Sequence, residues 1–480
     1  MEIKLLPPEI NNTGIINKLI NLIVDFLIGL KTKLGIDNPN NNPLTVVSHA
    51  ALKCYQAISP IWGKRIDERG RLFDTSHHTT FQHASSYFTF DIEKIAISDI
   101  TFGLHLASPF YNSDQRSGRY CAKMFLEPNY ELIDDYIAKF WPEVSSSDRT
   151  MAINFVKFGV EVFHTNIEQA TKTAVDLIKS ERPFAKGIEA TAAKIAQEQM
   201  RMFISLIFPT GMDFTVNLTA LAAMRLSAWT PGMRYATDKM AELIIAKHPE
   251  LAYVFAGERK DENWTPELHD KEKITFPKFQ LFSVTSPEKF VMPVSRDMHP
   301  IDTLHFQPKY MDNSVCRVKT QVKLSAATMG QDQRHRTISR AKPAFTGDFY
   351  MPPILSELKL EKAAEEVMTK WLEMKNVLPA TLWAAIAPYG AMLTYEKDGS
   401  ANAVAHEQGK RLCFCAQEEI YNLGRLEREA IKQEYGADSE LLKIFEPPCY
   451  RTGICAEGAR YCGRDLRIRN EDNFFPERKI

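Results

Sequence analysis

The sequence lacks a long apolar run and a long basic run. A transmembrane helix needs about 18 or more consecutive apolar residues, so we expect no membrane span. No secretory signal is recognised either, and we expect a cytoplasmic protein. The net charge is −1, which argues against a protein that coats nucleic acid but leaves room for a small anionic ligand.

Cysteine is also sparse, with eight in 480 residues. In a long chain without a secretory signal, this favours reduced thiols or metal ligands over a disulfide framework. Five cysteines cluster late in the chain: Cys413, Cys415, Cys449, Cys455 and Cys462. Their spacing is not that of a zinc ribbon. Two interpretations stay open, namely a structural metal site, zinc before iron–sulfur, and ordinary thiols.

What the chain does have is the composition of a globular protein. Hydrophobic residues make up 44% and charged residues 25% of the 480 residues. That length and composition predict two or three domains with ample material for a core. Residues 15–34 predict an amphipathic helix that packs on the body or on a partner, and an Asn-rich loop follows at 38–43.

The stretch 331–340 concentrates polar chemistry. It holds three arginines, one histidine, two glutamines and one serine within ten residues. Residues 316–324, just before it, alternate apolar and polar side chains, which predicts a half-buried strand. Arginine presents a rigid fork of donors that fits phosphate and carbonyl oxygens. We therefore expect these residues to bind a planar, phosphorylated ligand. The alternative is a solvated charged turn without a ligand.

Residues 334–339 read Arg-His-Arg-Thr-Ile-Ser. This run resembles the Arg-His-Arg-x-x-Ser signature of the flavin-dependent thymidylate synthases (ThyX). In that family the signature continues into Asn-Glu-x-Ser-x-Arg-Tyr, which is missing here after Ser339. A similar block, Asp-Gln-Arg-Ser-Gly-Arg-Tyr, stands at 114–120 instead. The chain thus resembles two ThyX-like halves that have each lost a different part of the motif.

Three further segments carry the resemblance. Residues 77–83 are similar to the family's His-x-Thr-Pro-Phe-Glu-His segment, and 201–217 to its stretch from Ala-Arg to Trp-Thr-Val-Asn. Residues 388–420 align with its final helical region and place Arg411 on the arginine that contacts uracil. In the first half, positions 218, 219 and 223 lack the flavin ligands of the family.

The resemblance implies an α+β (mixed) fold in which two ThyX-like α/β halves form an internal pseudo-dimer. We predict an N-terminal helix and loop over 1–43, a first ThyX-like domain over 44–255, a second over 256–436, and a cysteine-containing tail over 437–480. Two such chains would rebuild the family's tetramer, so we expect a homodimer.

The losses in the two halves complement each other. One side of the family's nucleotide site falls in the first half and the other side in the second half, which implies one composite site. Implied residues for dUMP are Gln331, Arg334, Gln115, Ser117, Gly118, Arg119, Arg201 and Arg411. Arg411 also carries the implied catalytic role, stabilising a uracil ring that has lost its N3 proton.

The implied cofactor is FAD, and the implied co-substrates are NADPH and methylenetetrahydrofolate. Positions assigned to FAD by the resemblance are His77, Thr79, Arg334, His335, Arg336, Gln115, Ser400, Asn402 and His406. The expected reaction is the reductive methylation of dUMP to dTMP. A methylase or hydroxymethylase of another pyrimidine nucleotide and a non-catalytic nucleotide-binding paralogue remain as alternatives.

Overall fold

The computed structural model describes residues 1–5, 43–55, 65–73, 88–116, 118, 123–259, 266–269, 275–290, 316–455, 461–469 and 474–480. These residues form two compact units. Unit 1 comprises Met1–Arg116 and Pro209–Trp264, and unit 2 comprises Ser117–Phe208 and Thr265–Ile480. None of the helices in the described part of the chain is long and apolar enough to cross a membrane.

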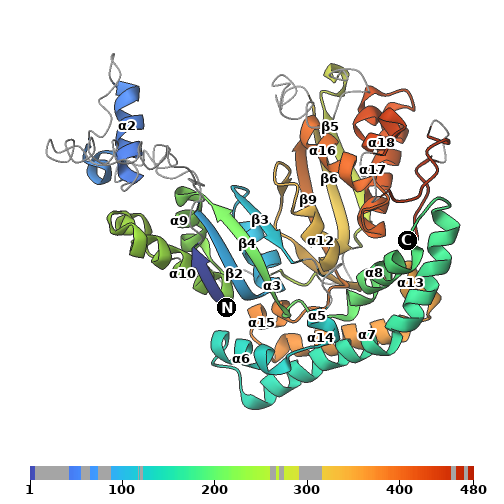
Figure 1. Cartoon of the computed structure of the whole chain (residues 1–480), viewed down its shortest axis with the longest axis horizontal. Helices are drawn as coiled ribbons and strands as arrows, with labels where there is room; N and C mark the ends of the chain where they lie inside the picture. The colour runs from blue at the N-terminus through green and yellow to red at the C-terminus, as the bar shows by residue number, and fades with distance from the viewer. Residues whose placement is uncertain are drawn as a thin grey trace, which may run out of the picture. The chain divides into compact units, whose positions relative to one another are not determined.

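Unit 1 is built on a four-stranded antiparallel sheet in the order β1-β2-β4-β3 (Figure 1). Its strands are β1 (Glu2–Leu5), β2 (Phe88–Ala96), β3 (Tyr111–Gln115) and β4 (Pro209–Val216). Alternate residues of β2, namely Phe88, Phe90 and Ile92, are buried in the core. Its helices are α2 (Pro43–Tyr55), α3 (Ile97–Asp99), α4 (His105–Ala107), α9 (Leu218–Ser227) and α10 (Pro231–Lys247).

Unit 2 contains the second sheet, in the order β5-β6-β9-β7, with β8 also paired to β9. The strands are β5 (Phe279–Thr285), β6 (Arg317–Ser325), β7 (Ser339–Arg340), β8 (Ala344–Phe349) and β9 (Ala391–Ser400). The predicted strand at 316–324 is thereby confirmed as β6. After the sheet come α16 (Ala401–Arg411), α17 (Glu418–Tyr435) and α18 (Pro448–Thr452).

The two sheets share one topology. In each, an antiparallel strand pair, β1-β2 or β5-β6, leads into short helical turns and a further short strand. A helical insertion follows, and the chain then returns as the strand that pairs with the second one, β4 or β9. Two helices close each series, α9 and α10 or α16 and α17.

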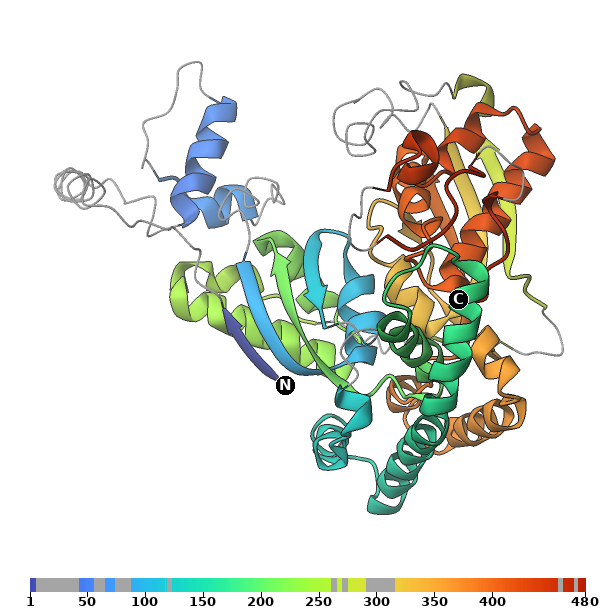
Figure 2. The ribbon, with the colours of Figure 1, turned by 45° about the vertical axis from the view of Figure 1, so that its right-hand side comes forward.

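Both helical insertions lie in unit 2 (Figure 2). The first supplies α5 (Lys123–Leu126), α6 (Tyr130–Phe140), α7 (Ser146–Glu181) and α8 (Ile188–Met200). The second supplies α13 (Pro353–Glu357), α14 (Glu361–Glu373) and α15 (Ala380–Ala385), and α13 and α14 pack on α7 and α8. The compact units therefore differ from the predicted division at residue 255, because residues 117–208 join the helices of the second half.

The mixture of helices with two antiparallel sheets confirms the α+β fold class. The stretch 388–420, expected to be helical, is interrupted by a strand, since β9 lies within it. In β9 the first five residues are all buried, so both of its faces are covered and no alternation marks it in the sequence. The predicted helix at 15–34 lies outside the described residues.

Candidate functional site

The Arg-His-Arg turn follows β6 through the short helix α12 (Ala326–Asp332). Ser325 caps this helix by accepting from the amide of Thr328 at 3.1 Å. Beyond α12, Arg340 fixes the turn from inside: its guanidinium donates to the carbonyl oxygens of His335 at 2.9 Å and of Ile338 at 2.8 Å. The same guanidinium pairs with the carboxylate of Asp332. The turn is thus held by its own last residue, and is not a solvated loop.

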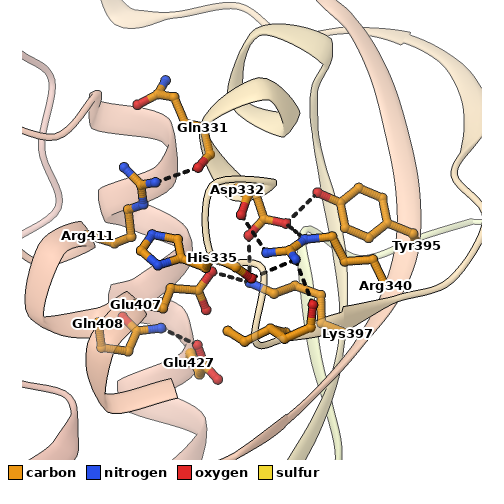
Figure 3. A network of polar contacts seen from close by, with 11 residues as sticks. Gln331, Asp332, His335, Arg340, Tyr395, Lys397, Glu407, Gln408, Arg411 and Glu427 are labelled. Atoms are coloured by element: carbon orange, nitrogen blue, oxygen red, sulfur yellow. Dashed lines mark hydrogen bonds and ion pairs between the residues drawn. The ribbon is translucent and has the colours of Figure 1, made fainter. Parts of the chain in front are cut away.

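Asp332 anchors a fully buried polar network (Figure 3). Its carboxylate accepts from Tyr395 Oη at 2.9 Å and from Lys397 Nζ at 2.7 Å. Lys397 also reaches Glu407 at 2.6 Å. Burial by itself would raise the pKa of Asp332, but Arg340 and Lys397 outweigh it and hold that pKa well below its usual range. Strand β9 and helix α16 are therefore tied to the turn by charge pairs.

A third carboxylate, Glu427, adjoins this network. Burial and the nearby charge of Glu407 raise the pKa of Glu427 to about 8. Gln408 donates to its carboxyl group. The network therefore holds one more acid than its two cations, Arg340 and Lys397, can balance, and a proton on Glu427 removes the excess charge near neutral pH.

The side chains of Arg201 and Gln331 meet at Gln417, the residue before α17. Its Oε1 accepts from Arg201 Nη2 at 3.2 Å and from Gln331 Nε2 at 2.5 Å. The backbone carbonyl of Gln331 in turn accepts from Arg411 Nη2 at 2.5 Å. Arg201 belongs to the first half of the sequence, whereas Gln331 and Arg411 belong to the second. Unit 2 thus brings together predicted nucleotide ligands from both halves.

Gly118, from the Ser-Gly-Arg block, also lies beside Arg201. Its carbonyl accepts from Gln197 Nε2 at 2.9 Å. A Cβ added at Gly118 would stand 3.3 Å from Arg201 Nη1, so a larger residue would press on that guanidinium. Its neighbours Ser117 and Arg119 lie outside the described residues.

Polar atoms without partners accumulate at this place. Among the described residues, the following have buried side-chain nitrogen or oxygen atoms that make no hydrogen bond: Arg201, Gln331, His335, Arg411 and Gln417. Arg201 and Arg411 form no salt bridge with a described residue, and Arg201 instead lies 5.1 Å from the Tyr389 ring centroid. Buried polar groups without a partner cost about 1–3 kcal/mol each, so their clustering marks a place for a polar ligand.

His335 has the most incomplete hydrogen bonding of this set, because both of its ring nitrogens are without a partner. Burial, and then the positive charge of Arg411, lower the pKa of His335 well below its usual value. The imidazole is therefore neutral near pH 7 and offers one donor and one acceptor. His406 lies edge-on to it, with the ring centroids 5.5 Å apart.

The other positions assigned to FAD are spread over the same unit. Arg334 is exposed and Arg336 half-buried on the turn. At the start of α16, Ser400 donates to Asn402 Oδ1 at 2.5 Å. His77 and Thr79 lie outside the described residues, and Gln115 ends β3 in unit 1.

Unit 1 has no comparable arrangement at the matching positions. Gly103, Leu104 and His105 stand where the second half has its Arg-His-Arg signature, and the first two are buried. His105 bonds to Ser113 at 3.0 Å and stacks on Tyr111. In the described part of unit 1, these positions contribute to the core and carry no cluster of unpartnered polar atoms.

A structural metal site at the five late cysteines is one of the two interpretations left open by the sequence, and it stays a hypothesis. All five are described and none of them is in a disulfide, and no group of three or more His, Cys, Asp or Glu side chains among the described residues is arranged to hold a metal ion. Arg182, Arg464 and Arg478 lie close to the thiols. Three guanidiniums disfavour a divalent cation at this place and favour anionic groups.

Sequence reasoning missed Gln417 and the network of Asp332, Arg340, Lys397 and Glu407. Gln417 stands six residues after Arg411, within the segment 388–420 that aligns with the family's final helical region, and this alignment is its only signal in the sequence. The network residues lie on three separate elements, so nothing local marked them as buried.

The comparisons with known proteins agree with the family resemblance in the first half. Residues 37–250 match the family model described as thymidylate synthase complementing protein. The prediction of the ThyX family is therefore confirmed for this segment. The match ends at residue 250, and no curated protein matches the chain.

One solved structure similar to this chain is thymidylate synthase X (ThyX) from Helicobacter pylori with FAD and dUMP. It shares 15% sequence identity, and the alignment covers 45% of this chain and 93% of that chain with a TM-score of 0.29.

The buried network predicts that Asp332→Asn lowers the free energy of unfolding by a large amount. The substitution removes a carboxylate from two buried cations, and breaking such a pair costs about 3–5 kcal/mol. Asp398→Asn is the matched control, because its pair with Arg317 at 2.8 Å is solvent-exposed and is expected to be worth under about 1 kcal/mol. Denaturant unfolding measures both, and equal costs would contradict the network's role.

The raised pKa of Glu427 predicts how the free energy of unfolding depends on pH. Its folded-state pKa of about 8 exceeds the unfolded value of about 4.3. Between those values the folded state binds a proton that the unfolded state releases, so this group lowers the free energy of unfolding as pH rises. Glu427→Gln keeps an acceptor for Gln408 but does not titrate.

We compare the free energy of unfolding of Glu427→Gln with that of the wild type. From pH 5 to pH 8 we expect this difference to rise in favour of the variant by on the order of 1–3 kcal/mol. Urea unfolding at both pH values measures it, with Glu434→Gln, an exposed position on the same helix, as control. Parallel pH curves for the wild type and Glu427→Gln would show that Glu427 does not hold the proton.

Proposed function

We propose that this chain is a flavin-dependent thymidylate synthase with one composite nucleotide site in unit 2. The observation that carries the proposal is a chain of contacts, in which Arg201 and Gln331 bond to Gln417 and Arg411 bonds to the Gln331 carbonyl, with unpartnered buried polar atoms on each of these side chains. The family of the first half supplies the reaction class.

The distribution of polar residues between the units supports a single site. The first half gives Arg201 and Gly118 to unit 2, and the second half gives Gln331 and Arg411. In unit 1, Gly103 and Leu104 are buried at the positions of the signature. The common strand order of the two sheets favours a tandem origin, and the complementary losses then leave one complete set of ligands.

The electrostatics of this place suit an anionic, planar ligand. Arg201 is a buried cation and Arg411 a half-buried one. Neither forms a salt bridge with a described residue, so a phosphate or an ionised ring would supply negative charge to both. Arg411 lies in the last turn of α16 and is fixed by its bond to the Gln331 carbonyl. From there it would stabilise the charge on a uracil ring that has lost its N3 proton.

The residues of the turn fit a flavin cofactor in chemistry. His335 offers a free donor and a free acceptor, and Arg334 and Arg336 offer charged donors for phosphates. When bound, FAD supplies the hydride that completes the methyl group, with NADPH and methylenetetrahydrofolate as co-substrates. Ser400, Asn402 and His406 stand at the start of the adjoining helix. Two chains would form the working homodimer.

Replacing Arg411 tests the assignment. We expect Arg411→Ala to abolish turnover of dUMP and to weaken dUMP binding at least tenfold, since a charge-assisted hydrogen bond is worth about 1.5–3 kcal/mol. Arg116→Ala is the control, because that arginine is exposed in unit 1 and pairs with Glu93. Titration calorimetry and a dTMP assay with FAD report both effects.

Full activity of Arg411→Ala, with an unchanged melting temperature, would contradict the role of this arginine. Turnover of dCMP in place of dUMP would assign the site to another pyrimidine methylase or hydroxymethylase. Nucleotide binding without any flavin would point to a non-catalytic paralogue.

A further inference from the structure

A cavity of about 550 Å³ lies in unit 2, where β6 ends and β9 begins. Its walls come from these two strands, from α13 and α17, and from residues 477–479, and we call it the α17 cavity. Small-molecule sites have volumes of about 300–1,000 Å³. The residues that line it do not include Arg201, Gln331, Arg411 or Gln417. The α17 cavity therefore has the size of a ligand site and a lining of its own.

The wall formed by residues 477–479 is fixed by hydrogen bonds. The amide of Arg478 donates to Asn422 Oδ1, and Asn422 Nδ2 donates to the Arg478 carbonyl, both at 2.9 Å. Gln199 Nε2 donates to the Lys479 carbonyl at 3.0 Å. Helices α17 and α8 thus hold this segment in place, and the cavity has a defined wall on this side.

Apolar side chains make up much of the lining. Five of them face the cavity: Met351, Pro353, Met392, Leu423 and Leu426. Tyr350 joins them, and its hydroxyl donates to Glu418 at 3.2 Å, so its polar atom is already engaged. A lining of this kind removes an aliphatic or aromatic group from water, which favours its binding.

The charged side chains of the lining give it a positive excess. Five are basic and three are acidic. Glu419 is the buried acid among them, and it accepts from the amide of Ser325 at 2.6 Å and from Ser325 Oγ at 2.5 Å. Burial raises the pKa of Glu419 to about 7, so it carries only part of a negative charge near neutral pH. The α17 cavity therefore suits an anion better than a cation.

Two of the basic side chains lack a close acidic partner. Lys323 has one, since it pairs with Asp348 at 2.7 Å. Arg425 has only Glu477 at 3.7 Å, which is beyond hydrogen-bond distance. Its Nε is buried and makes no hydrogen bond with a described residue. Lys278 is exposed and forms no salt bridge with a described residue. Donors are thus available beside the apolar lining.

We propose that the α17 cavity binds a small organic anion whose oxyanion head group pairs with Arg425 and Lys278. The aliphatic or aromatic body of this ligand lies on the apolar side chains. A guanidinium presents planar donors that match the oxygens of such a head group, and the buried Nε of Arg425 gains the acceptor that it lacks. The site is independent of the proposed function of the chain.

Fluorescence titration of the full chain with two probes is the test. Anilinonaphthalene sulfonate combines an aromatic body with one anionic head group, and phenylnaphthylamine has the same rings without the charge. We expect one saturable site per chain for the sulfonate. Arg425→Gln should weaken sulfonate binding by about tenfold or more, because it removes a charge-assisted pair, and should leave phenylnaphthylamine binding unchanged.

Two further variants establish where the probe binds. Lys432→Gln is the matched control, because Lys432 is exposed on the same helix α17 and does not line the cavity. It should bind both probes as the wild type does. Ser356→Trp introduces a large ring from an exposed position of the lining, and it should weaken the binding of both probes.

Three results would overturn the proposal. They are the absence of saturable sulfonate binding, equal sulfonate affinity of the wild type and Arg425→Gln, and displacement of the sulfonate by dUMP, which would place the probe in the nucleotide site. Should Arg425→Gln have a lowered melting temperature, Lys278→Gln takes its place, because that exposed lysine is expected to weaken sulfonate binding without affecting the core. Unchanged affinity in Lys278→Gln would then contradict the assigned head-group site.

Discussion

The candidate site depends on one buried interaction, the pairing of Asp332 with Arg340 and Lys397. Arg340 closes the turn that carries Arg334, His335 and Arg336, and Lys397 brings strand β9 to the same carboxylate. A buried ion pair of this kind seldom adds net stability compared with a well-packed apolar core. Its contribution here is placement, since the turn cannot change shape without separating charges in a medium of low dielectric constant.

From that anchor the structure extends in two directions. Through Glu407 the network reaches α16, whose last turn presents Arg411 to the Gln331 carbonyl. Through α17 it reaches Gln417, where Arg201 from the first half of the chain arrives. The helices of the two insertions pack together in unit 2, and this packing carries residues distant in sequence to one place.

Part of this arrangement could be predicted from the sequence. Strand β6 showed its alternation because only one of its faces is buried, and the Arg-His-Arg turn followed from its motif. Strand β9 could not be predicted in this way, since both of its faces are covered and its sequence has no period of two. Asp332 and Arg340 have the composition of a solvated turn, and only contacts from β9 and α16 bury them. The membership of residues 117–208 in unit 2 likewise depends on helix packing that no local pattern encodes.

The central claim is that one chain holds one working site built from both halves. The most direct measurement is the stoichiometry of flavin and dUMP per chain, from visible absorption of the reconstituted protein and calorimetric titration with dUMP. The account predicts about one FAD and one dUMP per chain, with NADPH bleaching of the flavin that responds to dUMP. Two of each per chain would mean that unit 1 retains a site, and that the complementary losses do not define a single composite site.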